Sequence, residues 1–113
     1  MHELSLVVAI ADKAREVLSE HGATRLVSVR VLLGVLSCAR RESLELCFPL
    51  VTRGTPLDGA RLDIVDAPLV LDCRACGERT ERREALLSCA QCGGVDVDVV
   101  GGRDLVISTM EVC

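Results

Sequence analysis

Four cysteines in two Cys-x-x-Cys pairs are the most informative chemical feature of this 113-residue sequence. The pairs are Cys73/Cys76 and Cys89/Cys92, and residues 77–88 separate them. Each pair is a tight chelate, and the spacer is long enough for one hairpin that brings the two pairs together. The pattern predicts a tetrahedral Zn²⁺ site with four cysteine ligands and one zinc per chain. A redox pair or a set of free thiols is the alternative.

A zinc site of this kind would be structural, because four thiolates saturate the metal and leave no open position for water or a substrate. Gly77 and Gly93 directly follow the second cysteine of each pair. Glycine permits the positive-φ turn that lets backbone N–H groups reach the sulfurs. The site would carry a net charge of about −2. Four nearby arginines are placed to offset that charge: Arg74, Arg79, Arg82 and Arg83.

The first three residues, Met1, His2 and Glu3, form a second candidate metal site. The Met1 amine, the His2 backbone nitrogen and the His2 imidazole can enclose one cation in fused chelate rings. Deprotonating the backbone amide needs a metal that prefers planar nitrogen ligation, which favours Ni²⁺ or Cu²⁺ over Zn²⁺ or Mg²⁺. Glu3 is placed to complete or orient the site. The alternative is a solvated His2 at a chain end without a metal role.

Composition narrows the range of partners. Half of the residues are hydrophobic, but Phe48 is the one aromatic residue, so the core must consist of Val, Leu, Ile and Ala. A platform on which nucleic-acid bases stack needs aromatic side chains. The net charge of −4 also argues against binding to a phosphate backbone. We therefore expect no nucleic-acid partner.

The same sequence gives expectations about location. No stretch reaches the roughly 18 apolar residues of a membrane span. The first residues lack the basic start and cleavage site of a secretory signal. Cys-x-x-Cys pairs without such a signal are typical of a cytoplasmic protein whose thiols are reduced or metal-bound. We expect no membrane association.

Hydrophobic periodicity predicts two helices. Residues 4–21 form the first, with Gly22 as a plausible C-cap and His21 favoured by the helix dipole, or alternatively a second nickel ligand. Residues 40–52 form the second, with Ser37 as a candidate N-cap. Val7, Ile10, Ala14, Val17 and His21 are predicted to lie along one face of the first helix.

The sequence also gives predictions for Pro49 and for the three cysteines outside the two pairs. Pro49 conflicts with a regular helix, so we expect a kink or an irregular last turn. Cys38 and Cys47 are expected to be small buried hydrophobes, whereas the terminal Cys113 is expected to be an exposed thiol.

Alternating hydrophobicity predicts strands over residues 24–33, 60–66, 95–99 and 105–112. Residues 69–71 lead into the first cysteine pair, and the charged run 78–84 is expected to be a solvated hairpin tip. The element order predicts an α+β fold. It comprises a small mixed or antiparallel sheet with two helices and an inserted zinc-ribbon-like hairpin module.

Several short motifs resemble, in their order and spacing, those of the HypA/HybF family, the nickel-insertion accessory proteins of [NiFe]-hydrogenase maturation. The opening residues 1–5 look like the family's start, and both Cys-x-x-Cys-Gly pairs look like its zinc hairpin. Gly34-x-Leu36-Ser37 is similar to the motif that follows its first strand. Residues 52–55 and 60–64 are similar to its Gly-Thr loop and next strand. The resemblance runs nearly from end to end.

The resemblance implies a two-part protein. Residues 1–69 and 103–113 would form a nickel-binding α+β domain, and residues 70–102 would form a zinc-binding module. It implies that His2 is the nickel ligand, with the Met1 amine and Glu3 beside it, and that Ni²⁺ is a transient cargo. It also implies two partners, a HypB-type GTPase and the hydrogenase large-subunit precursor that receives the nickel.

The sequence departs from the family's pattern at two positions. Val35 stands where the family often has glutamate, and Pro49 stands in a helix that normally runs unbroken. We interpret the chain as a nickel metallochaperone and not as an enzyme, since two histidines leave little for acid–base catalysis. The alternative is a zinc-ribbon protein–protein interaction module without its own nickel cargo. Both a monomer and a homodimer are compatible with the sequence.

Overall fold

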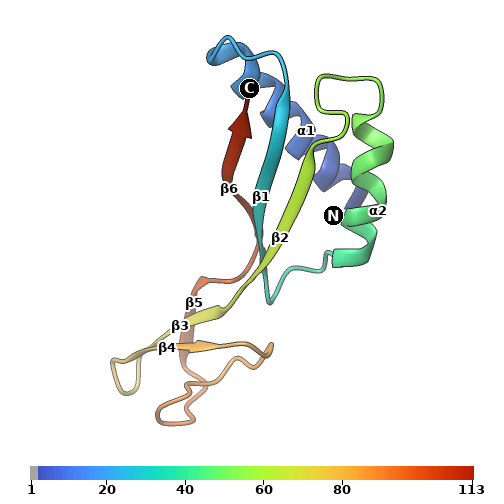
Figure 1. Ribbon diagram of the computed structural model, residues 1–113. Helices are drawn as coiled ribbons and strands as arrows, with labels where there is room; N and C mark the ends of the chain where they lie inside the picture. The colour runs from blue at the N-terminus through green and yellow to red at the C-terminus, as the bar shows by residue number, and fades with distance from the viewer. Residues whose placement is uncertain (1–2) are drawn as a thin grey trace. The chain divides into compact units, whose positions relative to one another are not determined.

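The computed structural model describes residues 3–113 and divides them into two compact units. The first unit comprises residues 3–31, Cys38–Val65 and Ile107–Cys113. The second comprises Leu32–Ser37 and Asp66–Val106. Figure 1 follows the chain in sequence order from blue to red. Each unit is thus assembled from segments that are not contiguous in the sequence.

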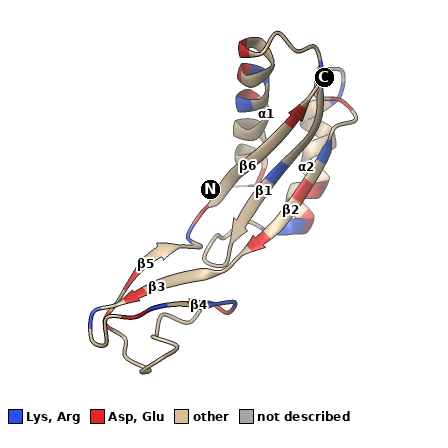
Figure 2. Ribbon diagram, turned by 60° about the vertical axis from the view of Figure 1, so that its left-hand side comes forward, with Lys and Arg blue, Asp and Glu red and all other residues tan. Residues whose placement is uncertain are grey.

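Two helices and the larger part of a three-stranded sheet make up the first unit, and one end of each strand belongs to the second unit. The helices are α1 (Glu3–Glu20) and α2 (Arg41–Thr52). The strands, in spatial order, are β2 (Arg61–Ala67), β1 (Leu26–Gly34) and β6 (Leu105–Val112). Figures 1 and 2 show both helices on the same side of this sheet. The predicted α+β class is confirmed.

Backbone hydrogen bonds at the strand ends make this sheet a mixed one. The Cys113 N–H, just after β6, donates to the Arg25 carbonyl just before β1 over 2.9 Å. The end of β6 therefore lies beside the start of β1, and the two strands are antiparallel. The Val35 N–H, just after β1, donates to the carbonyl of Ala67, the last residue of β2, over 3.2 Å. These two strands are parallel, with α2 in the crossover connection that parallel strands require.

Helix α1 buries one apolar stripe, made of Val7, Ile10, Ala11, Ala14 and Leu18. Val17 is half-buried and His21 is exposed, so the buried stripe differs from the predicted face at these two positions. Leu18 lies four positions after Ala14, one turn further along the same face, and takes the place assigned to Val17. Gly22 ends the helix at φ 61°. The next N–H, of Ala23, bonds to the Leu18 carbonyl over 2.9 Å, the geometry of a glycine C-cap.

Helix α2 begins one residue later than predicted and has a different cap. Its N-cap is Arg40, without a side-chain cap bond, so the assignment of Ser37 is wrong. The helix continues through Pro49 to Thr52, and the Arg53 N–H still bonds to the Pro49 carbonyl over 3.1 Å. Within the last turn the Thr52 hydroxyl donates to the Phe48 carbonyl over 2.9 Å.

Two of the three cysteines outside the pairs lie closer to solvent than the sequence predicts. Cys38 is exposed and Cys47 is half-buried, so the expected burial of Cys38 is wrong. Cys38 lies in the loop that precedes α2 and not within the helix, so no helical face carries it into the core. Cys113 is exposed, as predicted.

The second unit contains a three-stranded antiparallel sheet with β3 (Leu69–Cys73) at its centre. Its neighbours are β4 (Arg79–Arg82) and β5 (Val97–Gly101). Strand β4 lies in the charged run expected to be a solvated hairpin tip, so that prediction misses a strand. None of the helices within residues 3–113 combines the length and apolar character that crossing a membrane requires.

Candidate metal centre

The four paired cysteines converge in the second unit. The Sγ atoms of Cys73 and Cys92 are 3.7 Å apart, and those of Cys76 and Cys89 are also 3.7 Å apart. All four sulfurs lie within 4.8 Å of one another. Each of these contacts joins a cysteine of the first pair to a cysteine of the second. The hairpin of residues 77–88 therefore brings together ligands that are distant in sequence.

These distances fit one tetrahedrally coordinated ion. A Zn–S bond of about 2.3 Å places the corners of a regular tetrahedron about 3.8 Å apart. The 3.7 Å separations match that edge. A disulfide needs its sulfurs about 2.05 Å apart, and all the cysteines are free thiols. The donor set and its spacing therefore suit Zn²⁺, with Cys73 and Cys89 buried and Cys76 and Cys92 exposed.

The first pair sits on a tight backbone turn. The Cys73 N–H donates to the Glu78 carbonyl over 3.0 Å, and the Gly77 N–H returns to the Cys73 carbonyl over 2.9 Å. Gly77 has φ 78°, in the left-handed region that glycine occupies without steric cost. The positive-φ turn predicted from the Cys-x-x-Cys-Gly motif is present.

The second pair repeats this turn. The Cys89 N–H donates to the Gly94 carbonyl over 2.8 Å, the Gly93 N–H donates to the Cys89 carbonyl over 2.9 Å, and Gly93 has φ 77°. Two backbone N–H groups, those of Gln91 and Cys92, donate to the Cys89 sulfur over 3.3 and 3.4 Å. Sequence reasoning did not name Gln91 as a donor, because its side chain does not take part.

The same kind of bond is made at Cys73, whose sulfur accepts the Cys76 N–H over 3.4 Å. These backbone donors affect ionisation. The N–H of Cys92, followed by that of Gln91, lowers the pKa of Cys89 to about 6. At Cys76 the Glu78 N–H lowers the pKa, but burial and the neighbouring thiols outweigh it and raise the pKa to about 12. Cys89 therefore ionises more readily than Cys76.

The arginines near the pairs contact carboxylates and not sulfur. Arg74 donates to Asp96 over 2.7 Å and also to Asp98. Arg79 grips Asp72 with two bonds of 2.6 and 2.9 Å, and its hydrogen bonds hold the pKa of that carboxyl below the usual range. The hydrogen bonds of these two arginines thus go to carboxylates, whereas backbone N–H groups make hydrogen bonds to the sulfurs.

Arg74 ties the first cysteine turn to β5. Its N–H donates to the Asp96 carbonyl over 2.9 Å, in addition to the two side-chain ion pairs. Arg82, on β4, donates to the Ser88 carbonyl over 3.1 Å, next to the second pair. The hydrogen bonds of these two side chains connect the loops that carry the cysteines to the neighbouring strands. Figure 2 shows the charged residues along β4 and its neighbouring loops.

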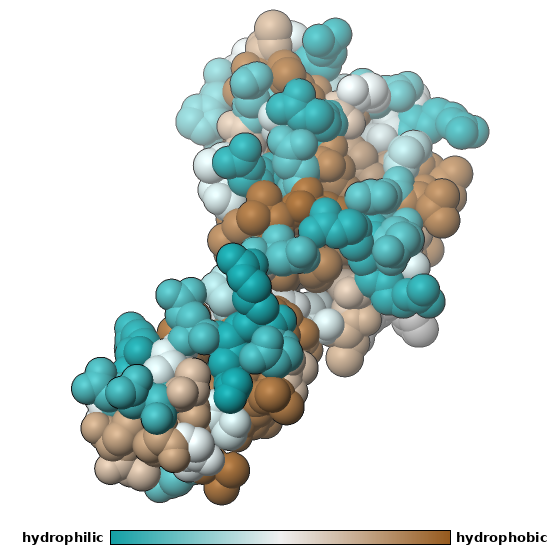
Figure 3. All heavy atoms as spheres, turned by 60° about the horizontal axis from the view of Figure 1, so that its bottom comes forward, coloured by the Kyte–Doolittle hydropathy of each residue, from teal (hydrophilic) through white to brown (hydrophobic). Residues whose placement is uncertain are grey.

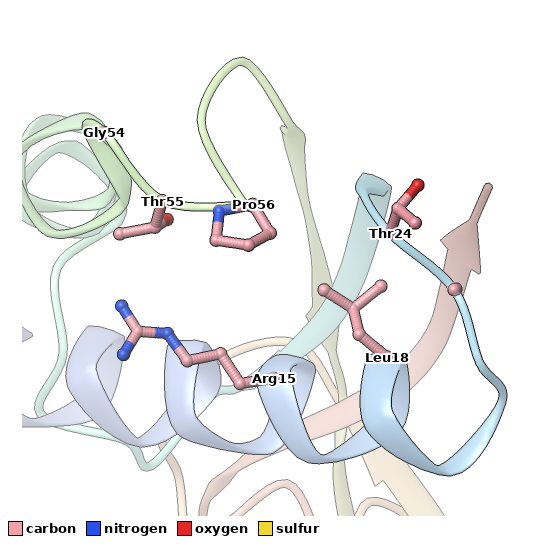
Figure 4. Close-up of a pocket in the computed structure, with 7 residues that line it drawn as sticks. Arg15, Leu18, Thr24, Gly54, Thr55 and Pro56 are labelled. Carbon is pink, nitrogen blue, oxygen red and sulfur yellow. The ribbon is translucent and has the colours of Figure 1, made fainter.

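Among residues 3–113, the cysteine cluster is the one grouping of three or more His, Cys, Asp or Glu residues suited to a metal ion. A cavity of about 410 Å³ lies in the first unit between α1 and the loop after α2 (Figure 4). Its lining includes Arg15, Leu18 and Thr55, and none of the lining residues is His, Cys, Asp or Glu. This cavity offers no metal ligands and no acid–base pair.

The predicted nickel site falls mostly outside the described residues, since Met1 and His2 precede residue 3. Glu3 is half-buried and is the first residue of α1. His21 follows the other end of the same helix. An 18-residue helix is about 27 Å long, so His21 cannot share one ion with Glu3 in the same chain.

The fold and the site define a small α+β metal-binding protein whose four-cysteine module supports a structural zinc. A family model described as "Hydrogenase/urease nickel incorporation, metallochaperone, hypA" matches residues 1–112. The chain belongs to this HypA family. The family is one of metallochaperones and maturation factors, so the chain is not an enzyme.

Curated relatives agree over the full length. The "Hydrogenase maturation factor HypA" of Nitrosospira multiformis is 35% identical over 111 residues, which cover 98% of this chain and 96% of that protein. The protein of the same name from Alkalilimnicola ehrlichii is 36% identical over 112 residues, covering 99% of each chain. The resemblance to this family that the sequence motifs indicate is thereby confirmed.

Two solved structures share the fold. "Solution structure of the Ni metallochaperone HypA from Helicobacter pylori" has a TM-score of 0.75 at 22% identity and covers 99% of this chain and 97% of that one. "Solution structure of HypA protein" has a TM-score of 0.76 at 24% identity, covering 100% and 97%. The predicted combination of two helices, small sheets and a zinc-ribbon-like module is therefore the fold of these proteins.

Proposed function

We propose that the chain binds Ni²⁺ at its N-terminus and delivers it to the [NiFe]-hydrogenase large-subunit precursor, while one Zn²⁺ per chain holds the four-cysteine module. The observation that carries this proposal is the family match over residues 1–112, which includes the Met1-His2-Glu3 start. The curated relatives are named hydrogenase maturation factors.

The proposed nickel ligands are the Met1 amine, the His2 backbone and imidazole nitrogens, and Glu3. Nitrogen donors of this kind favour Ni²⁺ over Zn²⁺. Glu3 opens α1, so the ligands adjoin a helix N-terminus. The partial positive charge there disfavours a bound cation, and the Glu3 carboxylate offsets part of that effect. A site with few ligands next to opposing charge suits a cargo that must leave.

The proposed zinc ligands are Cys73, Cys76, Cys89 and Cys92. Their coordination would be complete without water, and backbone N–H bonds orient the sulfurs. A saturated site with two buried ligands suits a permanent structural metal and not a cargo. Zinc there would supply charge compensation for the thiolates and the cross-link between the two turns.

We assign residues 1–69 and 103–113 to a nickel-binding domain and residues 70–102 to a zinc-binding module. The partners we propose are a HypB-type GTPase and the large-subunit precursor, both cytoplasmic. Neither nucleic acid nor membrane has a part in this function. The chain acts as a monomer or a homodimer.

Metal analysis combined with a calorimetric nickel titration tests the proposal. Wild type, His2→Ala and the matched control His21→Ala are compared. We expect one zinc per chain in all three, and nickel binding by wild type and His21→Ala but not by His2→Ala. Nickel binding of unchanged affinity by His2→Ala would overturn the nickel assignment, and chains without zinc would overturn the zinc assignment.

One observation favours a second function, a zinc-ribbon interaction module without nickel. Leu86, Leu87 and Val95 of the second unit are 51%, 52% and 79% exposed, and Figure 3 shows hydrophobic residues at the surface beside hydrophilic ones. Contiguous exposed apolar patches mark docking surfaces, whereas single exposed apolar residues are common on any protein. Adding one residue before Met1 separates the two functions, because it displaces the amine. Nickel binding should be lost under the first proposal, whereas partner binding should persist under the second.

A further inference from the structure

Three chain segments meet inside the second unit, and we call their contact the glycine clasp. The segments are residues 34–36 at the end of β1, residues 67–69 between β2 and β3, and residues 101–104 between β5 and β6. The two latter segments are the connections through which the chain enters and leaves the four-cysteine module.

Backbone hydrogen bonds hold residues 34–36 to both connections. The Gly34 N–H donates to the Asp104 carbonyl over 3.2 Å, and the Leu36 N–H donates to the Gly102 carbonyl over 2.8 Å. Between them, the Val35 N–H donates to the carbonyl of Ala67 over 3.2 Å. Three consecutive residues thus bond alternately to the chain leaving the module and to the chain entering it.

The segments approach so closely that two positions have no room for a side chain. A Cβ on Gly34 would lie 2.5 Å from the Gly102 oxygen and 2.8 Å from the Asp104 oxygen. A Cβ on Gly102 would lie 2.3 Å from the Pro68 oxygen and 2.7 Å from the Leu69 Cα. All of these neighbours are backbone atoms, which cannot rotate away as a side chain can.

Gly34 is required for space and not for backbone conformation. Gly34 is not among the described residues with positive φ. Gly102 has φ 84° and also has no room for a Cβ, so glycine is required there for both reasons. The Gly-x-Leu-Ser motif at residues 34–37 therefore has a physical explanation. Its glycine permits the approach, and its leucine N–H makes the shortest of the three bonds.

The clasp connects to the metal site through β3. This strand begins at Leu69, next to the clasp, and ends at the proposed ligand Cys73. Leu69 and Leu71 are fully buried and Cys73 is 4% exposed, so every second side chain of the strand is packed. Strand β3 is also paired on both edges. Its partner β5 ends at Gly101, within the clasp.

We propose that the glycine clasp couples metal binding at the four cysteines to the conformation of residues 34–36, the segment that leaves β1 for α2. Metal binding fixes Cys73 and with it β3, which holds Leu69 and Pro68 against Gly102. Release of the metal loosens β3 and opens the clasp. Because coupling is reciprocal, a change that opens the clasp also weakens metal retention. The inference rests on zinc in the cysteine site and is independent of nickel.

Hydrogen–deuterium exchange of the full wild-type chain, with zinc and after chelation, tests the first direction. We expect the Val35 and Leu36 amides to exchange at least about tenfold faster without zinc, as local opening predicts. The Ala23 amide, bonded to the Leu18 carbonyl in the first unit, should keep its rate. Unchanged exchange at Val35 and Leu36 while the Gly93 amide is released would overturn the coupling. Equal acceleration at Ala23 would also overturn it, since that is global unfolding.

A glycine substitution tests the reverse direction. In zinc-loaded Gly34→Ala we expect transfer of zinc to a chromogenic chelator to be about tenfold faster, the effect of forcing a methyl group into a packed contact. The matched control is Gly59→Ala in the loop before β2, where a Cβ meets nothing within 4 Å but φ is 80°, so the substitution strains the backbone without crowding a packed contact. Equal transfer rates in Gly34→Ala and wild type would overturn the proposal. If Gly34→Ala does not fold, the wild-type exchange experiment decides.

The zinc content of the purified chain separates this inference from the proposed function. A chain without zinc overturns the zinc assignment and the coupling together. If the purified chain contains zinc but the exchange rates of the Val35 and Leu36 amides do not change after chelation, only the coupling is overturned.

Discussion

The buried residues of the two units differ in number and in kind. In the first unit, residues of two helices and a sheet are buried together: Val7, Ile10, Ala11, Ala14, Leu18, Leu26, Val29, Val31, Leu44, Phe48 and Leu57. In the second, the buried hydrophobic residues are Leu69, Leu71, Cys73 and Cys89. Two of these four are proposed metal ligands, so apolar burial alone cannot hold the second unit.

The difference suggests that the same chain uses two sources of stability. The first unit depends on burial of aliphatic side chains, worth about 1.5–3 kcal/mol for each fully buried large residue. The second depends on sulfur–metal bonds and on backbone N–H groups that orient the sulfurs. Three of the following predictions change one source and leave the other intact, and the prediction on pH compares the two proposed metal sites.

Removal of zinc should have the largest effect. A structural zinc of this type contributes on the order of 10 kcal/mol to folding, more than the two buried leucines of the second unit can replace. After chelation we expect the amide resonances of β3, β4 and β5 to collapse to random-coil positions. Those of α1 should stay dispersed. Dispersed resonances from the second unit without metal would contradict the comparison.

Truncation of a buried side chain in the first unit should have the second-largest effect on stability. Leu44, on α2, is fully buried, and Leu44→Ala should lower the free energy of unfolding of the first unit by about 2–5 kcal/mol. The control is Leu46→Ala on the same helix, which is 72% exposed and should change stability by about 0.5 kcal/mol or less. Chemical denaturation followed by helical circular dichroism measures both. Zinc content should be unchanged, and a loss of zinc in Leu44→Ala would show that the cores are not separate.

Acidification should distinguish the two proposed metal sites. The Met1 amine and the His2 imidazole have reference pKa values of about 8 and 6.5, so both protonate as the pH falls from 8 to 6. Nickel affinity should then fall by at least about a hundredfold, because protons compete with the metal at the amine and the imidazole, and the His2 backbone amide, which also loses its proton on binding, adds to this dependence. Zinc should remain bound over this interval. Nickel affinity independent of pH in a calorimetric titration would exclude an amine–imidazole site.

A buried hydrogen bond should give the smallest effect. Thr52 is 2% exposed and its hydroxyl donates to the Phe48 carbonyl over 2.9 Å. Thr52→Val keeps the shape and removes the bond, which should cost about 1 kcal/mol of unfolding free energy. The exposed Thr109→Val is the control and should be close to neutral. A larger loss at Thr109 than at Thr52 would contradict this account of the first core.

Local patterns in the sequence were sufficient for most elements. The alternation over residues 105–112 predicts β6 with the bounds that the structure gives, and the Cys-x-x-Cys-Gly repeats predict both turns. Strand β4 escaped prediction because its residues are charged or polar, and pairing with β3 holds it instead of an apolar face. The exposure of Cys38 was missed because helix periodicity says nothing about where a loop ends and a helix begins.

The glycine clasp could not have been predicted from local patterns. Its members Gly34, Pro68 and Gly102 are far apart in the sequence, and only the tertiary structure brings their backbones together. The same holds for the bonds of Arg74 to Asp96 and Asp98, which no local pattern predicts. The cysteine spacing identifies a metal site, but the contacts that brace it depend on long-range strand pairing.

A single chelator competition tests the central claim, that sulfur holds one metal permanently while the chain's nitrogen-rich start carries another that must leave. The wild-type chain is loaded with one zinc and one nickel and mixed with a chelator of intermediate affinity, and both metals are then measured in the protein and chelator fractions. The account predicts that nickel passes to the chelator and one zinc stays with each chain. Zinc leaving first, or both metals leaving together, would contradict it.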